Sequence, residues 1–307
     1  MYVRVVAAAA TALLGAATLL LPSSDARARD VDDPPRMPAP SAPSAPPVSA
    51  PQVLAHRGAS AYAPENTLAA VSRAAGLGST WVENDVQRTK DGELVVIHDD
   101  TLARTTDAAR VFPDRAPWKV RDFTAAEIAR LDAGSWFGAA FTGTRVPTLA
   151  RYLRAVERHH QNLLLEIKSP ELYPGVERQI VKSLGDQGWL DARHLEHRLV
   201  VQSFSVDSLR TVHELEPGLR TAYLGRPATA NLPAFASFTD GVNPSFGSLS
   251  TGYVNAAHGF TGPHGRPLAV FTWTVNDADT ARKAAGLGVD GIITNKPDVI
   301  RAALPGS

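Results

Sequence analysis

Apolar and polar positions alternate along this chain in two different periods from residue 53 onward. Short runs rich in Val, Ile and Leu, typical of buried strands, alternate with stretches in which apolar residues recur every three or four positions, as in amphipathic helices. This alternation predicts a parallel α/β sheet. The predicted strands are Val53–His56, Trp81–Val86, Leu94–His98, Leu163–Ile167, Leu199–Gln202, Thr221–Leu224, Asp240–Asn243, Ala269–Trp273 and Gly291–Thr294.

The third of these runs differs from the others because only QRTKDGE, residues 87–93, separates it from the second. A parallel crossover needs about a dozen residues, and Lys90-Asp91-Gly92 is typical of a hairpin turn. We therefore expect 94–98 to pair antiparallel with the strand before it. The other eight strands, within residues 52–304, fit a TIM (β/α)8 barrel, which typically has about 250 residues.

Polar residues indicate where several helices begin, and Thr124 with Glu127 predicts a capping box. The four predicted starts are at Asn66-Thr67, Thr124, Thr148 and Asn276. The stretch at about 100–147 is long for a connection between barrel units, so it is expected to be an insertion over the barrel mouth. Its aromatic residues Trp118, Trp136 and Phe137 are expected to form a small core of their own rather than to contact a substrate.

The first 51 residues do not share this alternation. Arg4 precedes the apolar stretch Val5–Leu21, and Ala26-Arg27-Ala28 matches an A-x-A cleavage signal, which together predict a signal peptide at 1–28 and a secreted protein. The alternative is an uncleaved N-terminal membrane anchor, although the stretch is shorter than the usual span of about 20 residues. The Pro/Ala/Ser-rich segment 29–51 is expected to be a disordered linker, which leaves 52–304 as the folded domain.

Composition excludes several classes of function. The 31 basic and 31 acidic residues give no net charge, so no basic excess favours nucleic acid or an anionic membrane surface. The chain has no cysteine, which excludes disulfides and a lipid-modified cysteine anchor. It also lacks the G-x-S-x-G, H-E-x-x-H and P-loop motifs, so serine hydrolase, zincin and NTPase functions have no sequence support.

Charged groups stand at the ends of four predicted strands, where a barrel enzyme carries its active site. Glu83 and Asp85 are two residues apart and should point to the same face of their strand, where they repel one another unless a cation bridges them. With Glu166 they offer three oxygen ligands, which suit Mg²⁺ or Ca²⁺ better than Zn²⁺. The alternative is that each carboxylate forms a structural ion pair with Arg or Lys.

Two histidines and two cations accompany these carboxylates. His56 and His98 titrate near neutral pH and could serve as acid and base, whereas the other seven histidines are expected to make structural hydrogen bonds. Arg57 and Lys168 would place positive charge where a phosphate could bind. Their alternative role is to balance the charge of the carboxylates.

These residues lie within segments that resemble the glycerophosphodiester phosphodiesterase family. The resemblance implies a TIM barrel with an insertion after the second histidine, a divalent cation held by Glu83, Asp85 and Glu166, and paired acid/base histidines at 56 and 98. It also implies phosphate contacts from the two cations. Asn84 stands where an apolar residue is common in the family. The matching segments are AHRGASAYAPENTLAA, VENDVQRTKDGELVVIHDDTLARTT, LDAGSWF, PTLARYL, LLLEIK, QSF, WTVN and GVDGIITNKP.

The function implied is that of an exported, metal-dependent phosphodiesterase that hydrolyses glycerophosphodiesters to glycerol 3-phosphate and an alcohol. Either water attacks directly, or the substrate's own glycerol hydroxyl attacks to form a cyclic phosphate, which water then opens. Trp273 either packs against the glycerol carbons or only fills the barrel. A lysophospholipase D-type activity and a non-catalytic phosphopolyol-binding protein remain alternatives. A glycoside hydrolase using Glu83 and Glu166 is disfavoured by the histidines and cations. No nucleic acid partner and no stable membrane insertion after signal cleavage are expected.

Overall fold

The computed structural model describes residues 50–304. The predicted signal peptide at 1–28 lies outside the described residues, as does all of the predicted linker at 29–51 except its last two residues, and both stay predictions. Within 50–304, no helix is both long and apolar enough to cross a membrane.

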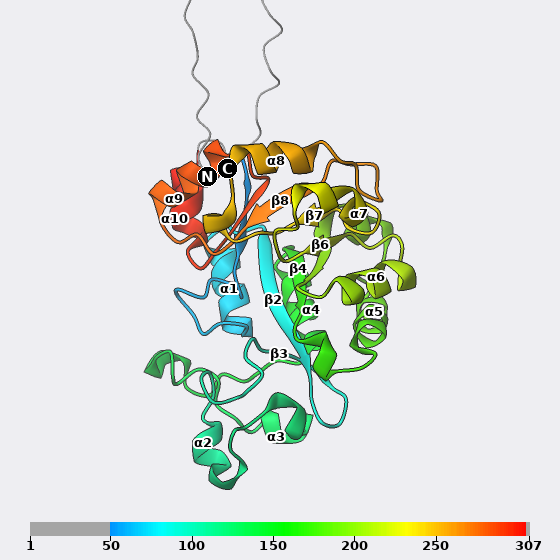
Figure 1. Ribbon diagram of the computed structural model, residues 1–307. Coiled ribbons are helices and arrows are strands. Elements are labelled where there is room, and N and C mark those ends of the chain that lie inside the picture. The colour runs from blue at the N-terminus through cyan, green and yellow to red at the C-terminus, as the bar shows by residue number, and fades with distance from the viewer. Residues whose placement is uncertain (1–49, 305–307) are drawn as a thin grey trace, which may run out of the picture. The chain divides into compact units, whose positions relative to one another are not determined.

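Eight parallel strands close into a barrel (Figure 1). Their order is β1-β9-β8-β7-β6-β5-β4-β2, and pairing of β1 with β2 closes the ring. The predicted TIM barrel is confirmed, and each predicted strand lies within two residues of its observed ends. The strands are β1 (Gln52–Ala55), β2 (Trp81–Arg88), β3 (Leu94–Val96), β4 (Asn162–Ile167), β5 (Leu199–Ser203), β6 (Thr221–Tyr223), β7 (Gly241–Val242), β8 (Ala269–Thr272) and β9 (Gly291–Thr294).

The strand β3 lies outside the ring and pairs antiparallel with β2, with Val86 opposite Val96. The hairpin that joins them turns at Gly92, whose φ of 90° lies in the left-handed region that glycine adopts at no steric cost. The predicted hairpin is thus confirmed. It carries the chain from the carboxyl end of β2 back to Asp85, whose carbonyl accepts from the Ile97 N–H, and then into the insertion.

A helix follows each barrel strand, and the side chains of Thr67 and Thr148 cap their helices as predicted. The fourth predicted start is wrong by one residue: Asp277 accepts the capping hydrogen bond, whereas Asn276 accepts one from the backbone N–H of Asn295. The barrel helices are α1 (Leu68–Gly76), α4 (Leu149–Arg158), α5 (Val176–Asp186), α6 (Val206–Leu215), α7 (Leu232–Ala236), α8 (Thr251–His258), α9 (Ala278–Gly286) and α10 (Pro297–Ala303).

Apolar side chains fill the barrel from inside and cover its outer wall. Trp81 and Leu164 belong to the inner cluster, which also includes Leu54, Val200, Ala222, Phe271 and Ile293. These side chains make the lower part of the barrel a packed core. Fully burying each large aliphatic side chain contributes about 1.5–3 kcal/mol to folding. Because side chains alternate along β2, Glu83 and Asp85 face inward above Trp81.

The insertion has a core of its own, built on Phe123, Leu102 and Leu131, against which Trp118 packs. Its helices are α2 (Ala108–Val111) and α3 (Ala125–Ile128), and Thr124 and Glu127 form the predicted capping box. The expected burial is wrong for Trp136, which is 41% exposed and meets Phe137 edge-on at the surface. The predicted small core of the insertion exists, but of the two tryptophans only Trp118 packs against it.

Candidate active site

Strands β2 and β4 bring three carboxylates together at the carboxyl end of the barrel. Asp85 and Glu166 are direct partners in the register of these strands, and Glu83 lies two residues before Asp85. Carboxylate oxygens from all three residues lie within 4.8 Å of one another, and all three side chains are buried. The predicted cluster is therefore assembled as the strand pattern indicated.

The electrostatics of this cluster favour a bound cation. Burial raises the pKa of Glu83 well above its ordinary value, with further contributions from the charges of Asp85 and Glu166. Burial and the charge of Asp85 raise the pKa of Glu166 to about 8. The Oδ1 atom of Asp85 accepts no hydrogen bond from any residue in the described part of the chain. A divalent cation would use this oxygen and offset the repulsion, so these residues fit one with hard oxygen ligands.

The two predicted cations lie beside the carboxylates. The backbone N–H of Arg57 donates to Glu83 Oε2 at 2.9 Å, and its Nε lies 3.3 Å from Asp85 Oδ2. Arg57 adopts a φ of 55°, a backbone conformation that costs a non-glycine residue about 1–3 kcal/mol. Lys168 Nζ lies 2.9 Å from Glu166 Oε1. The ion pairs offered as an alternative to a metal site are present, but they share the carboxylates of the cluster and leave the Oδ1 atom of Asp85 without a donor.

His56 and His98 both line the cavity above the carboxylates. His56 Nδ1 lies 2.6 Å from Asn295 Oδ1, and its Nε2 lies 4.0 Å from Glu83 Oε2. Burial, followed by the charge of Arg57, lowers the pKa of His56 to about 4. His98 Nδ1 lies 2.7 Å from Asp99 Oδ1. Each ring therefore has a hydrogen-bond partner at Nδ1, which orients it.

Among the remaining histidines, four make hydrogen bonds away from this cavity, in agreement with the structural role expected of them. These are His159 with Ser72, His194 with Asp191 and Glu157, His258 with Asp290, and His264 with Asp240.

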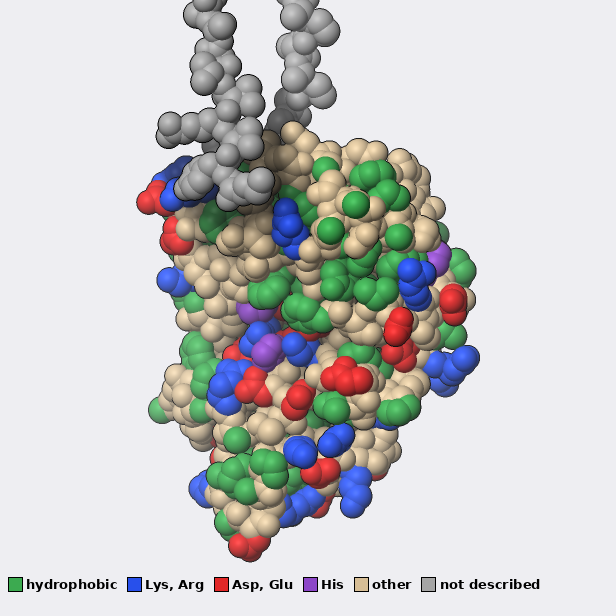
Figure 2. Space-filling model, in the orientation of Figure 1, with side chains coloured by type: hydrophobic (Ala, Val, Ile, Leu, Met, Phe, Trp, Pro, Cys, Tyr) green, Lys and Arg blue, Asp and Glu red, His purple; other side chains and the backbone are tan. Residues whose placement is uncertain are grey.

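One side of the cavity is apolar, formed by Phe204, Trp273, Leu224 and Ile293. The indole N–H of Trp273 donates to the backbone carbonyl of Asn243 at 2.7 Å, which fixes the ring. Phe204 is 52% exposed and meets Trp273 edge-on at 5.9 Å between ring centroids. Figure 2 shows histidine, basic and acidic side chains gathered around a hollow, with apolar side chains at its upper edge.

Sequence reasoning missed two buried residues that hold the backbone around His98. The Gln87 side-chain amide donates to the carbonyls of residues 97, 98 and 99, at 3.2, 2.9 and 2.7 Å. Tyr173 donates its hydroxyl to Gln87 Oε1 at 2.7 Å, which fixes the orientation of the amide. Tyr173 is far from Gln87 in sequence, and no local pattern indicates their contact.

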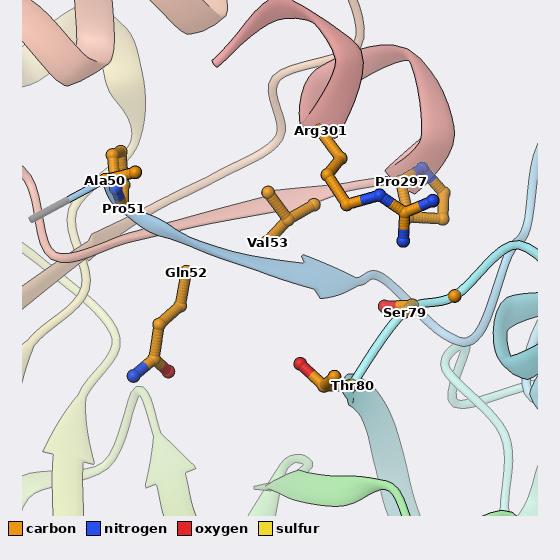
Figure 3. Close-up of a pocket in the computed structure, with 9 residues that line it drawn as sticks. Ala50, Pro51, Gln52, Val53, Ser79, Thr80, Pro297 and Arg301 are labelled. Carbon is orange, nitrogen blue, oxygen red and sulfur yellow. The ribbon is translucent and has the colours of Figure 1, made fainter. Parts of the chain in front are cut away.

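A second pocket lies at the opposite end of the barrel, where β1 begins (Figure 3). Its lining includes Gln52, Ser79, Thr80 and Arg301. Arg301 donates to the backbone carbonyl of Leu77. Among residues 50–304, no histidine or carboxylate lines this pocket, so the described lining offers no acid/base or metal-binding groups.

The sequence profile of the glycerophosphoryl diester phosphodiesterase family matches residues 56–299. The chain belongs to this family. A glycerophosphodiester phosphodiesterase of Caldanaerobacter subterraneus is 36% identical over 250 residues, covering 81% of this chain and 95% of the relative. One of Bacillus subtilis (strain 168) is 34% identical over 267 residues, covering 82% and 86%.

Solved structures agree with this family membership. A phosphodiesterase from Oleispira antarctica, solved in complex with its product sn-glycerol-3-phosphate, aligns with a TM-score of 0.70 and 29% identity. The alignment covers 83% of this chain and 96% of that one. The resemblance seen in the sequence and the predicted enzyme class, a phosphoric diester hydrolase, are thus confirmed, whereas the roles of individual residues stay predictions.

Proposed function

We propose that this enzyme hydrolyses glycerophosphodiesters to glycerol 3-phosphate and an alcohol, with Ca²⁺ or Mg²⁺ held by Glu83, Asp85 and Glu166. The observation that carries the proposal is a cluster of three buried carboxylates, two of which line a cavity together with both histidines and both cations. The names of the relatives and the product bound in the Oleispira enzyme support the choice of substrate.

The side chains divide the work as follows. A bound divalent cation would neutralise phosphate charge and make a coordinated hydroxyl easier to deprotonate. Arg57 and Lys168 would bind phosphate oxygens through charged hydrogen bonds. One of His56 and His98 removes a proton from the nucleophile, and the other gives a proton to the leaving alcohol. Trp273 covers the carbons of the glycerol.

The direct test measures release of glycerol 3-phosphate from a panel of glycerophosphodiesters that differ in the alcohol, with and without chelator. We expect release that chelator abolishes and that added Ca²⁺ or Mg²⁺ restores. Full activity in excess chelator would refute the metal assignment. Tight binding of glycerol 3-phosphate without turnover of any diester would instead identify a phosphopolyol-binding protein.

A lysophospholipase D-type activity is a second candidate, favoured by the exposed ring of Phe204 beside Trp273 at the cavity rim. An acyl chain extending from the glycerol could lie along these rings. Each Å² of apolar surface that it removes from water would contribute about 25 cal/mol to binding. Adding a lysophospholipid to the panel and measuring the free head group decides between the two candidates. Similar kcat/KM for lysophospholipid and deacylated diester would establish the second activity.

Export is also proposed, on the basis of the apolar stretch 5–21 and the cleavage signal at 26–28. Expression of the full chain in a secreting host, followed by N-terminal sequencing, should give a mature protein that starts at about Arg29 in the medium. Recovery of the intact chain in the membrane fraction would support the uncleaved anchor instead.

A further inference from the structure

A continuous series of charged hydrogen bonds crosses the mouth of the barrel from Arg57 to His98. Arg57 Nη1 donates to Glu65 Oε1 at 2.8 Å, and Arg104 donates to both oxygens of the same carboxylate, at 2.9 and 2.8 Å. Arg104 also donates to both oxygens of Asp99, at 2.6 and 2.9 Å. Asp99 in turn contacts His98 Nδ1 at 2.7 Å. The series therefore joins a predicted phosphate-binding cation to a predicted acid/base histidine.

Arg104 is the central residue of this series because its planar guanidinium engages two carboxylates at once. A guanidinium presents five N–H donors in a rigid plane, whereas the lysine ammonium is a compact charge that cannot make two such two-point contacts. Arg104 and Asp99 come from the same segment, between β3 and α2, and Glu65 comes from the loop between β1 and α1. The Arg104 side chain thus ties these two loops together beside the cavity.

Asp99 determines which nitrogen of His98 carries the proton. Hydrogen bonds from Arg104, together with its contact with His98, hold the pKa of Asp99 well below its ordinary value, so the carboxylate is ionised at neutral pH. An ionised carboxylate only accepts hydrogen bonds. His98 Nδ1 therefore donates to it, and the neutral ring keeps its lone pair at Nε2.

Stability alone gives little reason for this arrangement. The Arg104 side chain is 45% exposed, and exposed ion pairs contribute little to stability because water screens them. Glu65 is far less exposed, at 13%, and is shared by two arginines. The hydrogen bonds instead fix geometry: they restrict the position of His98 relative to Arg57.

We propose that Glu65, Arg104 and Asp99 are positioning residues, which hold His98 in one tautomer and one orientation relative to Arg57. The role of His98 rests on the proposed function, and the inference adds to it three residues outside the metal cluster. Proton transfer depends steeply on geometry, since a displacement of about 1 Å can cost about a hundredfold in rate. The series of hydrogen bonds would keep that displacement small.

The first experiment compares Arg104→Met with Arg110→Met in the full chain. Arg110 is a matched control because it also lies in the insertion and pairs with an aspartate, Asp107, but is 77% exposed and outside the cavity. We expect Arg104→Met to lower kcat by about tenfold to a hundredfold, with KM changed less than twofold. Arg104→Lys should recover only a small part of the loss, because it keeps the charge without the planar contacts. Arg110→Met should match the parent.

The second experiment reads His98 directly and does not depend on turnover. In protein labelled with ¹⁵N-histidine, the parent spectrum at alkaline pH should show His98 protonated at Nδ1 alone. Arg104→Met and Asp99→Asn should each give a mixture of the two neutral tautomers, while Arg110→Met retains the parent signals. If the chain failed to hydrolyse glycerophosphodiesters, this spectrum would still test the positioning of His98.

The proposal is overturned if the His98 spectrum of Arg104→Met equals that of Arg110→Met. It is also overturned if KM rises as much as kcat falls, since that would indicate a role in substrate binding. If Arg104→Met does not fold, kcat, KM and the His98 spectrum are measured on Arg104→Lys and Asp99→Asn instead. An unchanged His98 tautomer in both variants would refute the inference.

Discussion

Replacing Asn84 by leucine should stabilise the barrel. Asn84 lies on β2 between the inward-facing Glu83 and Asp85, so its side chain points outward into the layer between strands and helices. That layer includes Leu165, its register partner on β4. The side chain is fully buried, and neither its amide nitrogen nor its oxygen has a hydrogen-bond partner among residues 50–304.

The expected gain follows from the burial of this amide. A buried polar group without a partner costs about 1–3 kcal/mol, and leucine removes that cost at nearly the same volume. For a domain of this size each kcal/mol corresponds to about 2–4 °C in Tm, so we expect a rise of about 2–12 °C with unchanged kcat. Thermal unfolding of both proteins at pH 7 measures it.

Asn66 provides the matched control. It is also buried, but its amide donates to Asp85 Oδ2 at 2.7 Å, and its φ of 59° is unfavourable for leucine. Asn66→Leu should therefore lower the Tm. A lower Tm for Asn84→Leu as well would show that the Asn84 amide is hydrated or bonded in solution, and would refute the reasoning.

Four further outcomes are expected. Saturation with Ca²⁺ or Mg²⁺ at about 100 times Kd should raise stability by about 2.7 kcal/mol, measured by calorimetry against chelated enzyme, and Asp85→Asn should abolish the difference. Tyr173→Phe frees the amide that holds the backbone at His98, so kcat should fall a few-fold at unchanged KM and metal affinity; equal kcat would assign the hydroxyl to folding alone. Although partial desolvation opposes ionisation of Asp132, three backbone N–H donors lower its pKa. The stability that the ionised carboxylate contributes is therefore present above the unfolded pKa of about 3.9 and is lost as pH falls. Asp132→Asn should destabilise the fold at pH 7 and progressively less below pH 4, and a destabilisation that does not change with pH would contradict this. Trp273→Ala should impair glycerol diesters more than a small generic phosphodiester in kcat/KM, and equal losses would leave the ring a packing role.

The strands and the metal cluster could be predicted because local sequence encodes them. A barrel strand covered on both faces is a continuous apolar run, so a charged residue such as Glu83 or Glu166 stands out within it. Because the active site of a TIM barrel lies at the carboxyl ends of its strands, both residues could be assigned to it. Two-residue spacing placed Asp85 beside Glu83 without any knowledge of tertiary structure.

The partners of these residues depend on contacts that the sequence does not encode locally. Asn295 is 239 positions from His56, and Tyr173 is 86 from Gln87, so no periodicity connects them. Among these partners, only Asp99 is adjacent in sequence to the residue it contacts, His98. The position of Trp136 was also beyond prediction, because an aromatic residue in an irregular segment has no repeat that indicates which side faces the core.

The direction in which β1 enters the barrel has a practical consequence. Gln52 starts β1 at the end opposite the carboxylates, and the second pocket lies beside it (Figure 3). A support or fusion partner coupled next to Gln52 would therefore hold the enzyme by the end opposite the carboxylates, with the catalytic cavity open to diffusing substrate. Immobilisation through Trp136 on the insertion would instead bring the surface close to that cavity, and the two formats should differ in apparent kcat/KM for bulky diesters.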